Sequence, residues 1–277
     1  MSPTPRKQDD APLADEALAR HREELKKRFP LPQPKPRRRT STTLGALLLL
    51  GVAAGGLAWL DPAYRSERYS SAIGQRQVLD LADGSRVTLD GSSRITVSWH
   101  LRSRQVELQA GQALFSVSPA VYRPFRVVAD ATEVEVLGTR FNVDRQRDDV
   151  RVTVAEGKVA VRGDGASANL LAGDQVLVHA GQLGQPTRVD ADKVVAWKDG
   201  RLVFERTPLR EVLATLQRYR EVPIHLDDPR LAELPVSGVF DSARPDNLLA
   251  LLPQILPLKI SRDDDGALHL LGRGAEK

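Results

Sequence analysis

Residues 40–60 form an uncharged run, TSTTLGALLLLGVAAGGLAWL, that constrains the chain more than any other feature. About 20 helical residues cross the hydrocarbon core of a bilayer, and this run is long enough to do so. The basic stretch KPRRR at 35–39 precedes the run, and Asp61 follows it. Because basic residues flank the cytoplasmic end of a membrane helix, we expect a single-pass anchor with residues 1–39 in the cytoplasm.

Two alternatives compete with this anchor. A cleaved signal peptide is disfavoured because its polar leader would be 39 residues long and no clear A-x-A cleavage site follows. A buried core helix is disfavoured because such helices seldom follow a basic cluster so closely. We therefore expect residues 61–277 on the far side of the membrane.

Charge is distributed unevenly along the chain. Residues 1–39 carry 11 Lys and Arg against 6 Asp and Glu, whereas residues 61–277 are almost balanced, so the basic pI is poor support for nucleic-acid binding. The chain has no cysteine, which excludes disulfides, thiolate metal sites and a cysteine nucleophile. Its five histidines are scattered without ligand spacing, so we expect neither a metal site nor a cofactor.

The N-terminal arm contains one amphipathic pattern. Leu18, Leu25 and Phe29 share a helical face, with acidic residues before them and basic residues after them, which predicts a helix over about residues 15–29. A lone helix of this length is marginal in water, so we expect it to gain order from a partner protein or from the membrane surface. A solvated linker with a charged face is the alternative.

Residues 73–180 alternate apolar and polar side chains with the period of a strand, which predicts an all-β domain of short strands. In LDLADGSRV, the apolar faces agree only if a three-residue turn over residues 82–84 pairs Leu79 with Val87. The same requirement predicts two further hairpins, which pair Leu108 with Ala113 across residues 109–112 and Val154 with Val159 across residues 156–157.

After Trp197 the pattern changes to mixed helix and strand. Thr207-Pro208 and Pro245 are typical helix starts, and each is followed by apolar residues at helical spacing. Strand patterns flank both helices, so we expect the order strand, helix, strand, followed by strand, helix, strand, strand. The predicted fold class is mainly β, with one transmembrane helix, an all-β domain and a small α+β module.

Several stretches, in their order and spacing, resemble the FecR family of single-pass sigma-factor regulators over about residues 69–271. They are LADGSRVTLDGSSRI, RQVELQAGQALFSV, RPFRV, VLGTRFNV, VTVAEGKVAV, LLAGDQV, AWKDGRLVFERTPLREVLATLQRY and SGVF. The C-terminal module resembles the small fold that begins secretins and TonB-dependent transducers. The arm differs from typical members, which have a longer cytoplasmic domain that contains tryptophan.

The resemblance implies a relay in the inner membrane of a Gram-negative bacterium, with a cytoplasmic N-terminus and a periplasmic body. Its implied partners are the signalling domain of a TonB-dependent outer-membrane receptor, which reports an iron source, and an extracytoplasmic-function sigma factor. The expected segments are a sigma-interacting arm at 1–39, a transmembrane helix at 40–60, a FecR-like all-β domain at 61–195 and a receptor-interacting α+β module at 196–277.

Two surfaces are candidate partner-binding sites. Leu18, Leu25 and Phe29 form the surface that we expect to contact the sigma factor. In the C-terminal module, an exposed edge strand would accept a strand of the receptor. Its residues are Val236, Ser237, Gly238, Val239 and Phe240.

The pair Gly138-Thr139 interrupts the strand pattern of VEVLGTRFNV, and glycine inside a strand marks a bulge or a close backbone approach. The resemblance implies a second interpretation, because some family members split themselves between these two residues. The Thr139 hydroxyl would attack the Gly138 carbonyl, and water would open the resulting ester, with an activating base that the sequence does not identify. The alternative is a glycine bulge with the Thr139 hydroxyl bonded to backbone. Apart from this single turnover, we do not expect an enzyme.

A second class of function stays open. A structural periplasmic adaptor of a secretin-type assembly would use the same C-terminal module and would need no sigma factor. Neighbouring genes separate the two hypotheses, because a sigma-factor gene upstream and a receptor gene downstream favour the relay.

Overall fold

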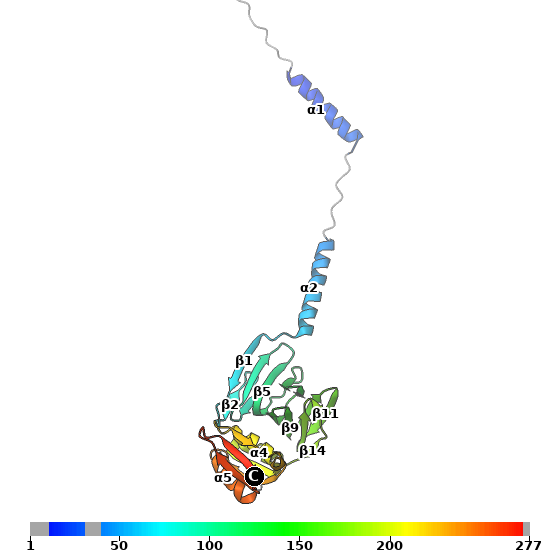
Figure 1. Cartoon of the computed structure of the whole chain (residues 1–277). Helices are drawn as coiled ribbons and strands as arrows, with labels where there is room; N and C mark the ends of the chain where they lie inside the picture. Colours follow the sequence, from blue (N-terminus) through cyan, green and yellow to red (C-terminus); the bar gives the residue numbers. More distant parts are fainter. Residues whose placement is uncertain (1–10, 31–39, 274–277) are drawn as a thin grey trace, which may run out of the picture. The chain divides into compact units, whose positions relative to one another are not determined.

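The computed structural model describes residues 11–30 and 40–273, without the side chains of residues 11–15, 40–44, 53, 54, 57 and 58 (Figure 1). The chain divides into two units, residues 1–54 and 55–277. Helix α1 (Ala11–Arg28) lies in the first unit, and it begins earlier than the sequence pattern predicts.

Helix α2 (Thr40–Leu60) covers the whole uncharged run. Its described apolar side chains, among them Leu48, Leu50 and Trp59, are exposed. Within the part of the chain that the structure describes, we find no helix with the length and apolar character needed to cross a membrane. The membrane anchor therefore stays a prediction from the sequence.

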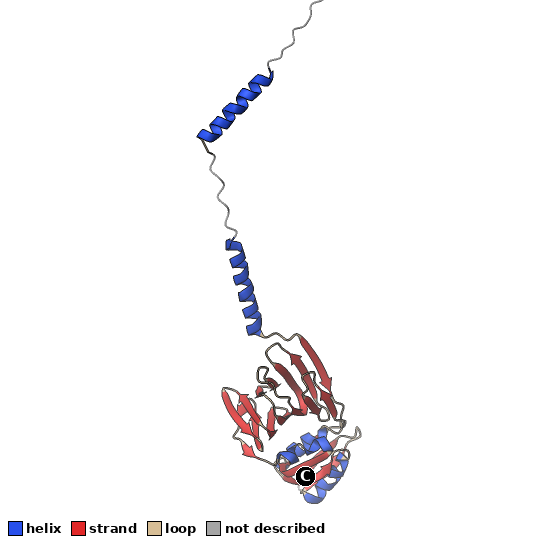
Figure 2. Cartoon of the chain, turned by 180° about the vertical axis from the view of Figure 1, so that it is seen from behind, coloured by secondary structure: helices blue, strands red, loops and turns tan. Residues whose placement is uncertain are grey.

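The body is mainly β, as predicted, and most of its strands belong to one curled sheet of 14 strands within the described residues (Figure 2). The sheet follows the order β11-β10-β7-β6-β5-β8-β9-β12-β13, and the other five strands pair beside this path. The strands are β1 (Arg65–Ser70), β2 (Gln77–Asp80), β3 (Arg86–Leu89), β4 (Arg94–Trp99), β5 (Arg104–Ser116), β6 (Phe125–Ala129), β7 (Thr132–Val136), β8 (Arg140–Gln146), β9 (Asp149–Glu156), β10 (Lys158–Gly163), β11 (Ala166–Leu171), β12 (Asp174–His179), β13 (Gln182–Leu183) and β14 (Thr187–Arg188).

Strand β5 joins the two halves of this sheet. Its first part pairs with β4 and β6, and its second part pairs with β3 and β8. Gly111 lies where the pairing changes, and its φ of +84° is a conformation that favours glycine. Both halves direct apolar side chains into one buried core, which includes Val106, Phe115 and Phe141.

The predicted turn at residues 82–84 is confirmed. Leu79 pairs with Val87, and the Leu81 N–H donates to the Ser85 carbonyl at 2.8 Å. Gly84 has a φ of +81°, as the last position of this turn requires.

The predicted hairpin across residues 109–112 is wrong. These residues continue β5, so Leu108 pairs with Ile95 of β4 and Ala113 pairs with Val143 of β8. An irregular residue inside a strand shifts the alternation, so the side chains after it point to the opposite face from the one expected. Two strands joined by a loop give the same pattern. The alternation of apolar residues therefore fits both arrangements.

The predicted hairpin across residues 156–157 is also wrong. Val154 of β9 pairs with Phe141, and Val159 of β10 pairs with Leu170. At Gly157 the chain crosses from one half of the sheet to the other, so β9 and β10 are not neighbours. The valines of both strands are buried, but those of β9 and those of β10 face the core from different halves of the sheet. They are Val152, Val154, Val159 and Val161.

Residues 195–270 build a second core, in which the helices of the body gather (Figure 2). The elements are α3 (Ala191–Val194), a 3-10 turn (Ala196–Asp199), β15 (Arg201–Pro208), α4 (Leu209–Gln217), β16 (Ile224–Leu226), a 3-10 turn (Pro229–Leu231), β17 (Pro235–Asp241), α5 (Pro245–Ile255), β18 (Leu258–Arg262) and β19 (Leu268–Gly272). Strands β15 and β17 form a ribbon, and β16, β19 and β18 form a separate three-stranded sheet. The order of strands and helices is the predicted one, whereas the segment boundaries stay predictions.

Candidate functional site

One face of the curled sheet is covered by the C-terminal module. Because side chains alternate along a strand, Gln112 and Leu114 of β5 and Asn142 and Asp144 of β8 lie opposite the β core. All four are buried, and Leu114 packs into the core of the C-terminal module. This face is therefore an interface between the two parts of the body.

Arg218, the residue that follows α4, places its buried guanidinium on this face. It forms an ion pair with Asp144 and donates to the Gln112 side-chain carbonyl at 2.6 Å. It also lies 3.7 Å from a carboxylate oxygen of Asp90, whose other oxygen accepts from the Tyr219 hydroxyl at 2.7 Å. The single positive charge of Arg218 is thus the countercharge of two buried carboxylates.

The backbone at Arg218 is held as closely as its side chain. Its carbonyl accepts from the Gly74 N–H at 2.9 Å and from the Ser92 hydroxyl at 3.2 Å. A Cβ on Gly91 would lie 2.8 Å from the same carbonyl oxygen. The loop that contains Gly91 approaches the end of α4 so closely that only glycine fits there.

A further set of hydrogen bonds extends this network to the start of the C-terminal module. Trp197 Nε1 and Gln112 Nε2 both donate to Asn142 Oδ1, each at 3.2 Å. The side chains of Trp197, Asn142, Gln112, Arg218 and Asp144 therefore form one connected buried network. Such networks hold their partners in a single arrangement when every member is paired.

Burial and the neighbouring charges shift the titration of this network. Burial raises the pKa of Asp90 despite the opposing effect of Arg218. For Arg218, burial lowers the pKa, but the carboxylates of Asp144 and Asp90 outweigh this and hold the pKa above its usual range. Asp90 lies beside this network, and its Oδ2 has no hydrogen-bond partner among the described residues, although the Arg218 guanidinium lies 3.7 Å away.

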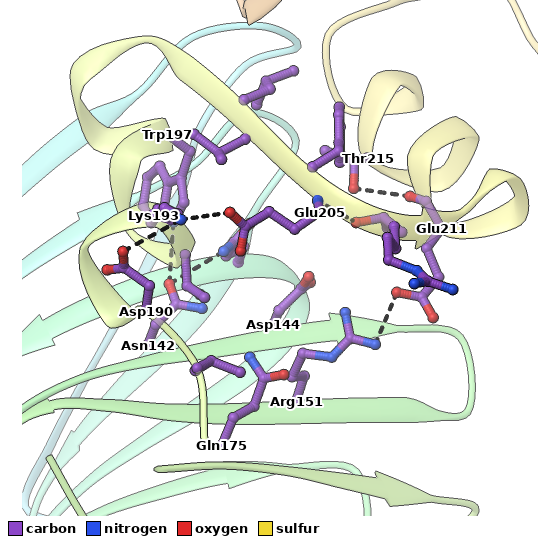
Figure 3. Close-up of a pocket in the computed structure, with 18 of the residues that line it drawn as sticks. Asn142, Asp144, Arg151, Gln175, Asp190, Lys193, Trp197, Glu205, Glu211 and Thr215 are labelled. Carbon is purple, nitrogen blue, oxygen red and sulfur yellow. Dashed lines mark hydrogen bonds and ion pairs between the residues drawn. The ribbon is translucent and has the colours of Figure 1, made fainter. Parts of the chain in front are cut away.

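A cleft of about 620 Å³ opens beside the network, between β8, β9, β15 and α4 (Figure 3). The Arg151 guanidinium on β9 lies 2.9 Å from the Glu211 carboxylate on α4, so this ion pair crosses the cleft. Lys193 contacts both Asp190 and Glu205 on the opposite side. The Arg151–Glu211 ion pair thus ties β9 of the sheet to α4 of the C-terminal module.

The structure places Gly138-Thr139 between β7 and β8, in a connection rather than inside a strand, so the predicted strand-interior position is wrong. The need for glycine comes from close packing, because a Cβ on Gly138 would lie 2.8 Å from the Cα of Pro119. Between a bulge and a close backbone approach as the reason for glycine here, the close approach is the one that fits.

Thr139 is buried, and its hydroxyl has no hydrogen-bond partner among the described residues. Its backbone carbonyl accepts from the Val117 N–H at 2.9 Å, and a Cβ on Gly157 would lie 2.7 Å from its Cγ2. The expected hydrogen bond from this hydroxyl to backbone is therefore wrong. A buried hydroxyl without a partner is rare and calls for an explanation.

The two predicted partner surfaces are far apart in the sequence and differ in exposure. Leu18 and Leu25 on α1, and Phe29 directly after its end, are all exposed. On β17, which pairs with β15 along one edge, Val239 is exposed but Val236 is buried in the module core. The binding roles of these residues stay predictions.

Sequence reasoning missed the buried network at Arg218. Asn142 and Asp144 alternate with core residues of β8, so they follow the pattern of a solvent-facing side of a strand. The signal that was available is Leu114, an apolar residue on that same polar face of β5. An apolar side chain on an otherwise polar strand face indicates that another element covers it.

Two protein families match the chain in sequence: "FecR protein" over residues 67–160 and "FecR, C-terminal" over residues 201–268. No curated protein matches it. Two crystal structures of a proposed anti-sigma factor from Parabacteroides distasonis ATCC 8503, at 2.50 Å and 1.65 Å resolution, are each 27% identical with a TM-score of 0.68. These matches cover 75% and 74% of this chain and 99% of the other. The buried network joins the two matched regions, and the chain belongs to the FecR family.

Proposed function

We propose that the chain relays a signal from a TonB-dependent outer-membrane receptor to an extracytoplasmic-function sigma factor, and that iron-source uptake genes are its targets. Membership of the FecR family, together with the fold shared with a proposed anti-sigma factor, supports regulation of a sigma factor. The inner-membrane location is supported by the sequence alone, through the uncharged run at 40–60 and the basic stretch at 35–39.

Three exposed apolar side chains, two on α1 and one directly after it, are the observation that carries the cytoplasmic half of this proposal. Leu18, Leu25 and Phe29 expose 67%, 54% and 72% of their surface. Burying one such side chain against a partner is favourable by about 1.5–3 kcal/mol, so three of them supply a useful binding energy. A sigma factor in the cytoplasm is the partner that fits the family.

Co-purification of the full-length chain, in detergent, with the sigma factor encoded beside it tests this proposal. We expect the wild type to retain the sigma factor, and Leu25→Asp or Phe29→Asp to lose it. The matched control is Ala19→Asp, which adds the same charge to the same helix on another side. Equal retention by Ala19→Asp and Phe29→Asp, or no retention by the wild type, would contradict the proposed surface.

For the receptor side, we propose the free edge of β17. This strand pairs only with β15 among the described residues, so its other edge can accept a strand. The exposed Val239 and the half-buried Phe240 supply side chains for a partner, whereas the buried Val236 anchors the strand to its own module.

We also propose a single self-cleavage between Gly138 and Thr139. The observation that favours it is the buried, unpaired Thr139 hydroxyl. Its oxygen would bond to the Gly138 carbonyl carbon, the peptide C–N bond would break, and the proton would pass to the leaving amine. Water would then hydrolyse the ester, which yields a Gly138 carboxylate and restores the Thr139 hydroxyl.

A further inference from the structure

One end of the curled sheet lies where the chain enters it after α2. Strand register places Arg65, Trp99, Arg104, Phe125 and Val136 side by side across β1, β4, β5, β6 and β7. Strand β1 begins shortly after α2 ends, so the loops beside this row share the end of the sheet that follows α2.

These loops expose large apolar side chains. Leu101 projects from the connection between β4 and β5, and Leu137 follows β7. Val121 and Tyr122, in the connection between β5 and β6, expose 72% and 94% of their surface. Tyr64, directly before β1, is exposed as well. Exposed apolar side chains that gather in one place mark an interaction surface.

Hydrogen bonds fix these loops to the residue that follows α2. The Asp61 carboxylate accepts from the Arg102 N–H at 2.9 Å and from the Ser103 hydroxyl at 2.8 Å. Arg123 then donates to the His100 carbonyl at 2.6 Å, which ties the loop of Tyr122 to the loop of Leu101. The loop of Leu101 is therefore bonded directly to the residue that follows α2, and the loop of Tyr122 is bonded to the loop of Leu101.

The end of α2 is itself apolar and exposed. Trp59 and Leu60 immediately precede Asp61, and both are largely exposed. Tryptophan and tyrosine favour the boundary between lipid and water because their rings are apolar with a polar edge. Trp59, Tyr64 and Tyr122 thus supply the side chains expected at such a boundary.

We propose that this end of the β domain, defined by Tyr64, Leu101, Val121, Tyr122 and Leu137, rests in the headgroup region of a lipid bilayer. The inference rests on the proposed membrane anchor, since α2 would enter the same bilayer at Trp59. Hydrogen bonds through Asp61 keep the loops at that depth. The consequence is that the β domain makes a contact of its own with the membrane, in addition to the anchor.

The absence of cysteine in the chain allows a direct test. Single variants Leu101→Cys and Tyr122→Cys, in the full-length chain, are labelled with an environment-sensitive fluorophore and reconstituted into phosphatidylcholine–phosphatidylglycerol vesicles. Val239→Cys, an exposed position in the C-terminal module, is the matched control, and Trp59→Cys reports the anchor. We expect nitroxide-labelled lipids to quench positions 101 and 122 several-fold more than position 239.

The outcomes separate the inference from the anchor on which it rests. Quenching at position 59, with positions 101 and 122 no more quenched than position 239, overturns the inference and leaves the anchor intact. No quenching at position 59 overturns both. If positions 101 and 122 escape lipid quenching but are also shielded from iodide in the water, a protein partner or a second copy covers this surface, and the lipid assignment falls.

Discussion

At the scale of single residues, Arg218 links three segments of the β domain to the C-terminal module. Its guanidinium contacts Asp144, Gln112 and Asp90, and its carbonyl accepts hydrogen bonds from two loops of the β domain. Removing one member of a buried ion pair leaves an uncompensated charge, which costs about 3–5 kcal/mol. The side chain therefore decides how firmly the C-terminal module is attached.

We expect Arg218→Met to lower the free energy of unfolding of the body by about 3–5 kcal/mol, because Asp90 and Asp144 stay buried without a countercharge. Denaturant unfolding of the full-length chain in detergent measures this loss. The control is Arg210→Met, which removes the contacts of a half-exposed guanidinium with Glu233 and Glu211 and should cost less than about 1 kcal/mol. Similar losses for both variants would contradict the role assigned to Arg218.

Thr139 supports a second prediction at this scale. We expect the purified chain to contain two associated fragments, residues 1–138 and 139–277, because the unpaired hydroxyl lies next to the Gly138 carbonyl in sequence. Mass spectrometry of the denatured protein identifies them. Thr139→Ser should still split and Thr139→Ala should stay intact, so a fragment ending at Gly138 in Thr139→Ala would rule out this chemistry.

At the scale of elements, His269 clamps the three-stranded sheet of the C-terminal module. Its Nδ1 lies 2.8 Å from the Asp227 carboxylate after β16, and its Nε2 lies 3.0 Å from Asp263 at the end of β18. His225 stacks on the same ring, with 4.8 Å between the ring centroids. The hydrogen bond with Asp227 raises the pKa of His269 above its ordinary 6.5, and Asp263 adds to the effect.

The sign of this shift predicts the pH dependence of stability. A raised pKa in the folded state means that protonated His269 stabilises the fold below about pH 6.5, and that the contribution is lost as pH rises through the folded pKa. We expect the Tm advantage of the wild type over His269→Gln to be largest below about pH 6.5 and to shrink as the pH rises through the raised pKa of the folded state. The control is His21→Gln on α1, and an advantage that stays constant with pH would exclude the clamp.

The strands show which pairings the sequence predicts and which it does not. The turn before Ser85 was predictable, because only one turn length brings Leu79 opposite Val87. The strand through Gly111 and the crossing at Gly157 were not, since an irregular strand and a hairpin place the same residues on the same face. Sequence periodicity determines which side chains are buried but leaves the strand pairing open.

At the scale of the whole molecule, two cores share one buried polar interface. The first core draws on residues 79–178, and the second draws on residues 195–270 together with Leu114 of β5. The apolar residues that form each core were predictable from their strand or helix periodicity. The interface was not, because its Asn142, Asp144 and Arg218 come from segments far apart in sequence and each looks solvent-exposed when taken alone.

If the chain relays a signal from a receptor as proposed, this interface lies between the proposed receptor-binding strand and the β domain. A partner that adds a strand to β17 acts on the same module that Arg218 attaches to the β domain. If the β domain in turn rests on lipid beside α2, a change at β17 reaches the membrane through packed and hydrogen-bonded elements. The exposed face of α1 would then pass the change to the sigma factor.

Transcription from promoters that depend on the neighbouring sigma factor tests the central claim that the chain controls this factor through α1. The measurement compares cells that lack the gene with cells that carry the wild type, Phe29→Asp or Ala19→Asp. We expect Phe29→Asp to match the deletion and Ala19→Asp to match the wild type, and the direction of the change identifies the chain as inhibitor or activator. Transcripts that do not differ between the deletion and the wild type, with and without inducing signal, would contradict the claim.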